Sequence, residues 1–309
     1  MNVSTQKNNV FKYNSRFHHV IRKWDIQFGG LAANHFNFTN FFGIGNNTIQ
    51  NDSLTNLDFY KTTYNSYSVN AGMVRDFWKK SSFSVNAELQ HNTPQIGKNA
   101  TALNDSETNP FIAFGTINNN IFISTTQLEI NFTDRKNLPE KGIKINGELK
   151  HGTILNNNKS TYNIISGTAV HYFTAYIPIP ITLGLKGGGS VSNGIIPFYN
   201  LTYLGSTDNL RGYKNNRFTG KSTAFFNTEL RVQLLNVSST FIPMKLGLRG
   251  FYDTGRVFSD YEISNKWHSG YGLGIYWVFL NENYTFNLSV ARSEEENSLI
   301  LFSFGKAFN

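Results

Sequence analysis

Charged residues in two separate segments have the types and the setting of a buried ion pair. Arg211 is flanked by Leu210, Gly212 and Tyr213 in a stretch rich in turn-forming residues, whereas Asp253 lies in a stretch that alternates like a β-strand. Guanidinium and carboxylate groups form short, paired hydrogen bonds. If the strand lines the inside of a closed sheet, this pair would hold a long loop in place.

Alternation along the preceding predicted strand supplies a second acid for the arginine. Glu229 falls on the polar face of that strand, and Asp253 shares the polar face of its own strand with Lys245 and Arg249. Both acids would then face one polar interior, which makes Glu229 a second acceptor for Arg211. In another interpretation, Arg211 is an exposed turn residue. Asp253 would then pair with Lys245 or Arg249.

Alternation with a period of two is the dominant pattern of the chain, and helical periodicity is nearly absent. Each alternating stretch has one apolar face and one small or polar face. Their lengths approach the roughly ten residues that a tilted strand needs to cross a bilayer. The clearest examples are residues 224–234, 244–254, 271–279 and 284–291.

Short and long connections alternate along the chain, which is typical of outer-membrane barrels with short periplasmic turns and longer outside loops. The triplet Gly187-Gly188-Gly189 is expected to bend the chain where a strand enters the longest loop. The short connections are expected at 134–141, 236–243 and 281–283, and the longer ones at 95–116, 187–220, 256–269 and 292–297.

These patterns predict an all-β fold. We expect a transmembrane antiparallel up-and-down β-barrel of about 12 to 16 strands that closes by pairing its first and last strands. Residues 1–309 would form this single barrel domain, with one long extracellular loop. No apolar stretch reaches the ~18 residues of a membrane-spanning helix, and aromatic residues, at 15%, suit a lipid face with interfacial girdles.

Composition argues against several classes of function. The chain has no cysteine, which excludes disulfides, thiolate metal sites and a cysteine nucleophile. Its histidines lack metal-ligand spacing and no nucleophile-elbow pattern occurs, so we expect no catalytic residue, metal or cofactor. The net charge is +8, but the basic residues are scattered rather than interleaved with aromatics, which argues against nucleic-acid binding. The first residues are polar, so we expect no signal peptide.

An ordered series of motifs resembles the BamA/TamA-type barrels, also called the bacterial surface antigen family. Asp134-Arg135 with Pro139 and Gly142 is similar to the family's mid-barrel periplasmic turn. The best match covers 120–309, without the periplasmic POTRA modules that assembly factors of the family carry. The other matching segments are 196–200, 205, 210–213, 216–218, 220, 227–231, 251–255, 272–274 and 302–308.

The resemblance implies a protein of the bacterial outer membrane that inserts or translocates other proteins. It also implies that the long extracellular loop is folded into the lumen, where Arg211 pairs with Asp253. Phe304, Gly305 and Phe308 would form a C-terminal signal that the assembly machinery recognises, although a terminal aromatic is also an ordinary interface residue. The expected partners are outer-membrane lipids, lipopolysaccharide, unfolded outer-membrane protein clients and accessory assembly subunits.

Two other roles stay open at this point. The chain could be the membrane anchor of a larger protein that bears an enzyme domain. It could also be a pore for secretion or diffusion, in which case its lumen would conduct ions.

Overall fold

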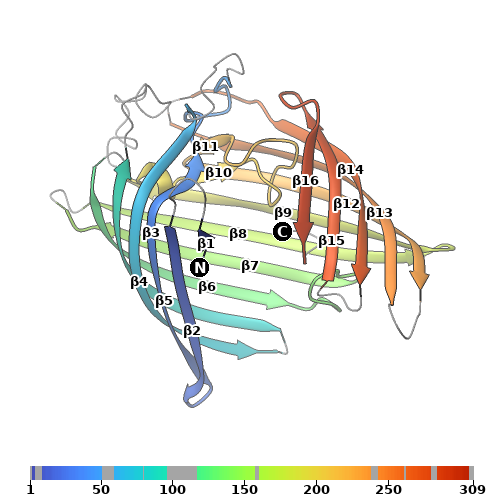
Figure 1. Ribbon diagram of the computed structural model, residues 1–309, viewed down its shortest axis with the longest axis horizontal. Helices are drawn as coiled ribbons and strands as arrows, with labels where there is room; N and C mark the ends of the chain where they lie inside the picture. The colour runs from blue at the N-terminus through green and yellow to red at the C-terminus, as the bar shows by residue number, and fades with distance from the viewer. Residues whose placement is uncertain are drawn as a thin grey trace.

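Antiparallel β-strands make up almost all of the protein in the computed structural model (Figure 1). No helix in the part of the chain that the structure describes is long and apolar enough to cross a membrane. For 35–39 only the backbone is described. The described residues are 2–3, 9–50, 59–78, 80–95, 117–156, 160–237, 243–260, 262–279 and 284–305.

Fourteen of the strands form one sheet, and each of them pairs with the next one along the chain. β9 pairs with β12, because β10 and β11 between them form a separate two-stranded sheet. These are β1 (Asn2–Val3), β2 (Asn9–Ile21), β3 (Trp24–Asn40), β4 (Lys61–Phe77), β5 (Ser81–Gln95), β6 (Asn119–Asn131), β7 (Gly142–Ile154), β8 (Thr161–Tyr176), β9 (Pro180–Gly194), β12 (Ser222–Val237), β13 (Met244–Phe258), β14 (His268–Phe279), β15 (Tyr284–Ser293) and β16 (Leu299–Phe304).

The two faces of the sheet differ as the alternation predicts. On β12 and β13, Leu230 and Leu248 are 46% and 48% exposed on the outside, whereas Glu229 and Asp253 are buried on the inside. An outer surface of apolar side chains is unfavourable in water but favourable in contact with lipid. The predicted all-β barrel architecture with a polar interior is therefore confirmed.

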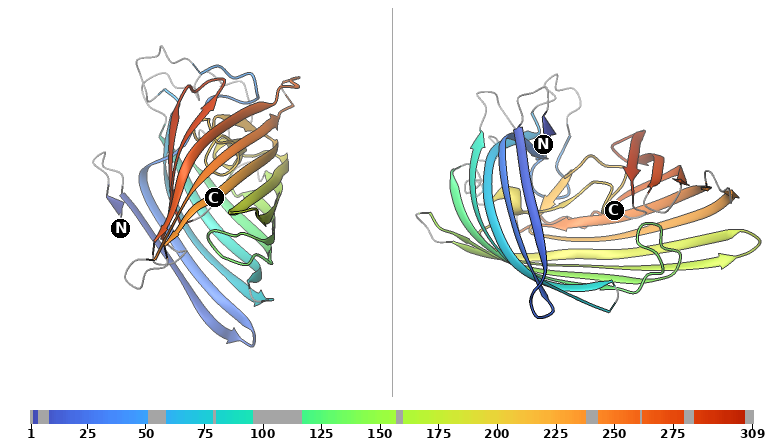
Figure 2. Two further views of the ribbon diagram at one scale, coloured as in Figure 1. Left: turned by 90° about the vertical axis from the view of Figure 1, so that its right-hand side faces the viewer. Right: turned by 60° about the horizontal axis from the view of Figure 1, so that its bottom comes forward.

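The sheet curves strongly but does not close (Figure 2). We call the gap between β2 and β16 the seam. Within the described residues, β16 pairs with β15 alone, and β2 pairs with β3 and, at Asn9 and Val10, with β1. The expected pairing of the first and last strands is therefore absent within the described residues, where β16 has 6 residues and β2 has 13.

Connections divide the barrel into two ends, which we call the turn end and the loop end. At the turn end, β2 and β3 are joined by two residues, and β6 and β7 by residues 132–141, which include the turn predicted at 134–141. At the loop end, the connections between β3 and β4 and between β9 and β12 are longer, whereas residues 259–267 between β13 and β14 are about as long as the β6–β7 turn. Apart from the length of that turn, short and long connections alternate in the predicted order.

The glycine triplet corrects one expectation about where the longest loop begins. Gly187, Gly188 and Gly189 lie in the middle of β9 and pair with β8 and β12 rather than forming a bend. A Cβ at Gly188 would come 2.6 Å from the ring of Phe225, and one at Gly189 would overlap the carbonyl oxygen of Thr223. Gly188 and Gly189 are therefore needed for close strand packing, and the loop begins only after Gly194.

The loop between β9 and β12 lies inside the curve of the sheet (Figure 2). It contains the short helix η2 (Phe198–Asn200) and the hairpin of β10 (Thr202–Leu204) and β11 (Phe218–Gly220). Phe198 packs in a buried cluster with Tyr64 and Ile121 from the sheet wall. We call residues 195–221 the inner loop.

Candidate functional site

Arg211 of the inner loop forms a paired ion contact with Asp253 of β13. Its Nε lies 2.7 Å from Asp253 Oδ2 and its Nη2 lies 2.7 Å from Oδ1. The backbone N–H of Arg211 also donates to Oδ2 at 2.9 Å. The arginine is 4% exposed and the aspartate fully buried, so solvent screens this contact weakly.

Glu229 of β12 accepts from the same arginine and sits among two more. Arg211 Nη1 lies 2.6 Å from Glu229 Oε2, and Arg249 Nη2 bonds to that same oxygen. Arg231 Nε lies 3.7 Å from Glu229 Oε1. One buried carboxylate thus holds three guanidinium groups together, which is favourable only because each charge has an opposite neighbour.

Strand register explains why these groups meet. Asp253 is paired with Asn227, Glu229 with Phe251 and Arg231 with Arg249, so the inward side chains of β12 and β13 bring the acids next to the arginines. The guanidinium carbon of Arg211 lies 3.9 Å from the centre of the Phe251 ring. This cation–π contact adds to the ion pairs and fixes the plane of the guanidinium.

The backbone beside Arg211 depends on glycine. Gly212 has φ +96°, a conformation that L side chains rarely adopt, and a Cβ there would lie 2.9 Å from the carbonyl oxygen of Arg292. Leu210 is buried among inner-loop and β13 residues. Burial raises the pKa of Tyr213 to about 12, and its hydroxyl donates to the carbonyl oxygen of Ser269 at 3.3 Å. The segment therefore fits tightly against β14 and β15.

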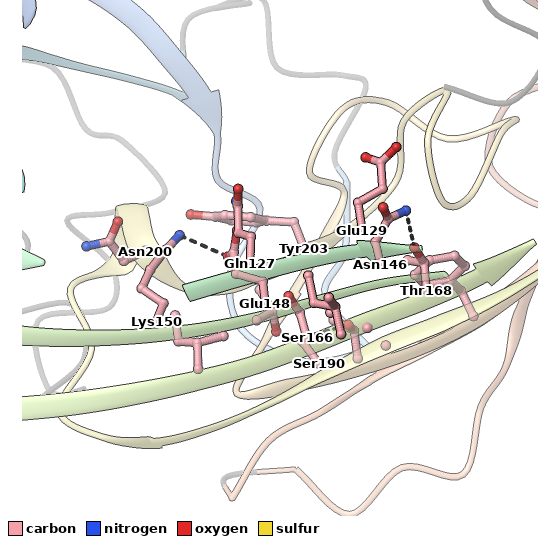
Figure 3. A pocket seen from close by; sticks show the side chains of 18 of the residues that line it. Gln127, Glu129, Asn146, Glu148, Lys150, Ser166, Thr168, Ser190, Asn200 and Tyr203 are labelled. Atoms are coloured by element: carbon pink, nitrogen blue, oxygen red, sulfur yellow. Dashed lines mark hydrogen bonds and ion pairs between the residues drawn. The ribbon is translucent and has the colours of Figure 1, made fainter. Parts of the chain in front are cut away.

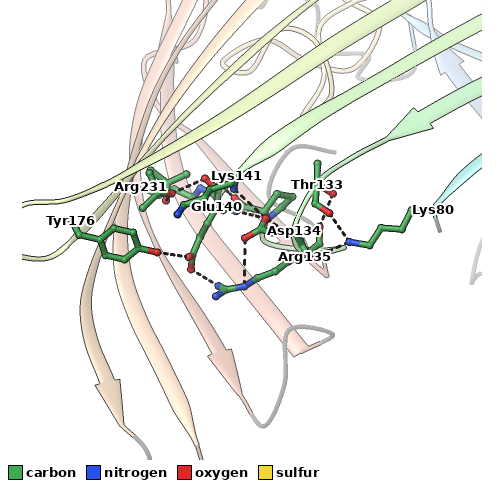
Figure 4. A network of polar contacts seen from close by, with 11 residues as sticks. Lys80, Thr133, Asp134, Arg135, Glu140, Lys141, Tyr176 and Arg231 are labelled. Carbon is green, nitrogen blue, oxygen red and sulfur yellow. Dashed lines mark hydrogen bonds and ion pairs between the residues drawn. The ribbon is translucent and has the colours of Figure 1, made fainter. Parts of the chain in front are cut away.

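The same arginine cluster reaches the turn between β6 and β7, which folds into the lumen from the turn end (Figure 4). Arg231 Nη2 donates to the carbonyl oxygen of Pro139, and Thr174 Oγ1 donates to that of Glu140 at 2.7 Å. Leu138 packs on Tyr276 and Val278 of β14. The turn and the inner loop are therefore connected through Arg231 and the carboxylate of Glu229.

A carboxylate inside that turn fixes its shape. Asp134 Oδ1 accepts the backbone N–H groups of Arg135, Glu140 and Lys141 at 3.0 to 3.1 Å. Gly142 follows with φ +108°, and a Cβ there would overlap the carbonyl oxygen of Phe132. These contacts explain why the sequence motif has an aspartate at 134 and a glycine at 142.

The lumen keeps a polar cavity of about 520 Å³ beside the inner loop (Figure 3). On its wall, Gln127 Nε2 donates to Glu148 Oε2 at 2.6 Å and Lys150 Nζ lies 3.5 Å from Glu148 Oε1. Asn146 donates to Thr168 at 3.2 Å. Within the described residues, no group of three His, Cys, Asp or Glu side chains is placed to hold a metal ion. The wall resembles the hydrated interior of outer-membrane barrels.

The structure brings Arg211, Asp253 and Glu229 together but does not place the predicted C-terminal signal as a unit. Phe304 ends β16 and packs against Phe286, with ring centres 4.9 Å apart. Gly305 follows with φ +90°, and Phe308 lies outside the described residues. The recognition role of these three residues stays a prediction.

Alternation alone did not identify several charged contacts of the inner loop. Arg231 and Arg249 are visible in sequence as inward-facing cations, but their shared acceptor Glu229 depends on three-dimensional register. Arg217 is buried and binds Glu295, although the acidic run 294–296 is typical of a solvated loop. In the sequence, Arg217 stood out only because it lies in segment 216–218, which resembles the family.

The fold and the pinned inner loop define a class: a transmembrane β-barrel with a long loop inserted from one end. A profile of the Omp85 superfamily domain matches residues 4–308. The chain therefore belongs to the Omp85 superfamily, a family of outer-membrane β-barrel proteins, as the motif resemblance predicted. A comparison with curated protein sequences gives no match.

Solved structures share this fold at low sequence identity. BamA from Haemophilus ducreyi lacking POTRA domains 1–3 matches with TM-score 0.67 and 12% identity over 96% of this chain. CdiB from Acinetobacter baumannii matches with TM-score 0.57 and 12% identity, and CdiB from Escherichia coli with 0.55 and 9%, each over 96% of this chain. The chain spans 60%, 49% and 56% of these three chains, less than two thirds of each.

Proposed function

We propose that the protein is a non-catalytic barrel of the bacterial outer membrane that inserts or translocates other proteins. Residues 1–309 would act as one barrel domain. The loop end would face the cell exterior, and the apolar outer face would contact outer-membrane lipids and lipopolysaccharide. Its further partners would be unfolded outer-membrane protein clients or accessory assembly subunits.

The unpaired edge at the seam is the observation that carries this proposal. Beyond Val10, β2 pairs within the described residues only with β3, so one row of its backbone N–H and C=O groups lacks a strand partner. Such an edge is a template for strand addition. A client strand that pairs there would satisfy these groups, and it would enter the bilayer already hydrogen-bonded on one side.

The two segments inserted into the lumen support assembly over free diffusion. The inner loop enters from the loop end, and the β6–β7 turn enters from the turn end. Arg211, Glu229 and Arg231 link these two segments by buried ion contacts. A plain diffusion pore would need an open path through the region that they occupy. The side of the barrel is thus a better route for a client than its axis.

Depletion of the protein from its native bacterium tests the proposal. We expect the amounts of other β-barrel proteins in isolated outer membranes to fall, while inner-membrane proteins stay constant. Quantitative mass spectrometry measures both sets. Unchanged barrel levels, or the loss of one secreted partner alone, would contradict the assembly role.

A further inference from the structure

Arg217 is a fully buried arginine of the inner loop whose contacts lie at the loop end, away from the Arg211 site. Its Nε lies 2.6 Å from Glu295 Oε2, and its Nη2 lies 2.7 Å from Glu295 Oε1. Glu295 belongs to the connection between β15 and β16. This paired contact therefore ties the inner loop to the C-terminal side of the seam.

The same guanidinium also binds the N-terminal side of the seam. Its Nη1 donates to Thr48 Oγ1 at 2.7 Å, and its Nη2 donates to the Thr48 carbonyl oxygen at 2.5 Å. Thr48 lies in the connection between β3 and β4. The guanidinium carbon lies 5.1 Å from the Phe42 ring centre and 4.6 Å from that of Phe218. One side chain thus bridges loops from opposite edges of the open sheet.

A second bridge runs parallel to the first. The backbone N–H groups of Asn46 and Asn47 donate to Glu262 Oε2 and Oε1 at 2.5 and 2.7 Å. Asn46 also exchanges hydrogen bonds with the backbone of Val257, at 2.8 and 3.0 Å. Glu262 lies in the β13–β14 connection and Val257 near the end of β13. These contacts again join the β3–β4 connection to the C-terminal side.

Glycine makes the second bridge possible. Gly45 has φ +116°, its N–H donates to the Thr219 carbonyl oxygen at 2.9 Å, and a Cβ there would overlap the carboxylate of Glu262. The β3–β4 connection therefore contacts the inner loop and the β13–β14 connection at one point. In contrast, no strand pairing joins β2 directly to β16 within the described residues.

We propose that Arg217, together with Glu262 and its amide donors, is a clamp that holds the loop ends of both sides of the seam together. The seam would then open along the strands and at the turn end, with the clamp as its hinge. This proposal rests on the proposed function only in giving the seam a role in client entry. The existence of the clamp is tested without any client.

Distance measurements between spin labels in the refolded full chain test the clamp. The chain has no cysteine, so Ile49→Cys and Asn297→Cys give specific labels, and Ile49 is 83% exposed. This pair spans the clamp, and we expect a narrow distance distribution. A second pair, Val20→Cys and Phe302→Cys, spans the seam nearer the turn end. It should give a broader distribution, and equal widths would overturn the hinge.

Arg217→Ala should shift the Ile49–Asn297 distribution to longer and broader distances. Lys214→Ala is the matched control, because it removes one partly exposed cation from the same loop, whose Nζ lies 3.2 Å from Glu296 Oε1. That variant should keep the native distribution. A native distribution in folded Arg217→Ala protein would overturn the clamp.

A milder variant covers the case in which Arg217→Ala does not fold. Glu262→Gln keeps the shape of the acceptor but removes its charge, and it should broaden the same distribution to a smaller extent. The pair Ile263→Cys and Asn297→Cys lies on one side of the seam and should not change in any variant. If Glu262→Gln leaves the Ile49–Asn297 distribution unchanged, the clamp is wrong.

Discussion

At the scale of single residues, burial decides how much each charge matters. Arg211, Glu229 and Asp253 lie out of water and compensate one another, so the loss of one leaves the others with an uncompensated desolvation cost. Exposed ion pairs such as Lys266 with Glu294, at 2.9 Å, contribute little by comparison. The stability of the inner loop should therefore depend on a few buried positions.

Arg211→Ala and Asp253→Ala should each destabilise the folded barrel by roughly 3–5 kcal/mol, because each leaves a buried partner uncompensated. The double variant should cost less than the sum of the two, since both remove the same contact. Urea unfolding in detergent measures these free energies. Lys245→Ala, on the same face of β13 but half-buried, should change stability by less than about 0.5 kcal/mol. Additive effects of the two variants would contradict the pair.

Alternation in the sequence located the two acids of this site, because a period of two fixes the face on which each residue lies, whereas the pairing of Arg211 with Asp253 was expected from the family resemblance. From that pattern alone, Glu229 and Asp253 fall on the inner face. The roles of Arg217 and Glu262 could not be found in the same way, because their partners are in loops, where no periodicity gives direction. Contacts between distant loops depend on how the whole chain folds.

At the scale of elements, strand existence and order were predictable, but strand ends and edge pairing were not. Alternation identified β12 to β15, although the structure extends β13 to Phe258 beyond its predicted end at residue 254. The glycine triplet was misplaced because glycine suits both a bend and a close strand contact. Only the neighbouring Phe225 and Thr223 show which of the two applies.

Gly189→Ala should lower the thermal stability of the folded barrel, because its methyl group would overlap the backbone of β12. Gly187→Ala is the matched control on the same face of β9, where the nearest atom to a new Cβ is 3.8 Å away, in the Phe226 ring. For both variants, the midpoint temperature is measured at which the folded barrel loses its faster migration in gels. Equal midpoints would show that β9 tolerates the added methyl group.

At the scale of the whole molecule, two segments enter the lumen while one side of the sheet stays open. The inner loop and the β6–β7 turn meet at the Glu229 cluster, and the seam lies between strands of unequal length. This arrangement places an inserted loop and an inserted turn in the lumen beside an unpaired lateral edge. The sequence patterns predicted the barrel and the resemblance predicted the inserted loop, but the expected pairing of the first and last strands is absent within the described residues.

Planar bilayers test whether the inner loop blocks the axial path. The native protein should conduct weakly, and Arg211→Ala should raise its current because the loop loses its main contact with the barrel wall. Lys214→Ala changes the net charge of the same loop by the same amount and should leave the current near the native value. High current in the native protein would contradict a filled lumen.

Strand addition at the free edge of β2 is tested most directly by cross-linking in cells. Asn14→Cys places a thiol on that edge, and Ser166→Cys places one on β8, which is paired on both sides. With a thiol cross-linker, Asn14→Cys should yield adducts with other outer-membrane barrel proteins during their synthesis, whereas Ser166→Cys should yield none. No adducts at Asn14, or equal adducts at both positions, would contradict client entry at the seam.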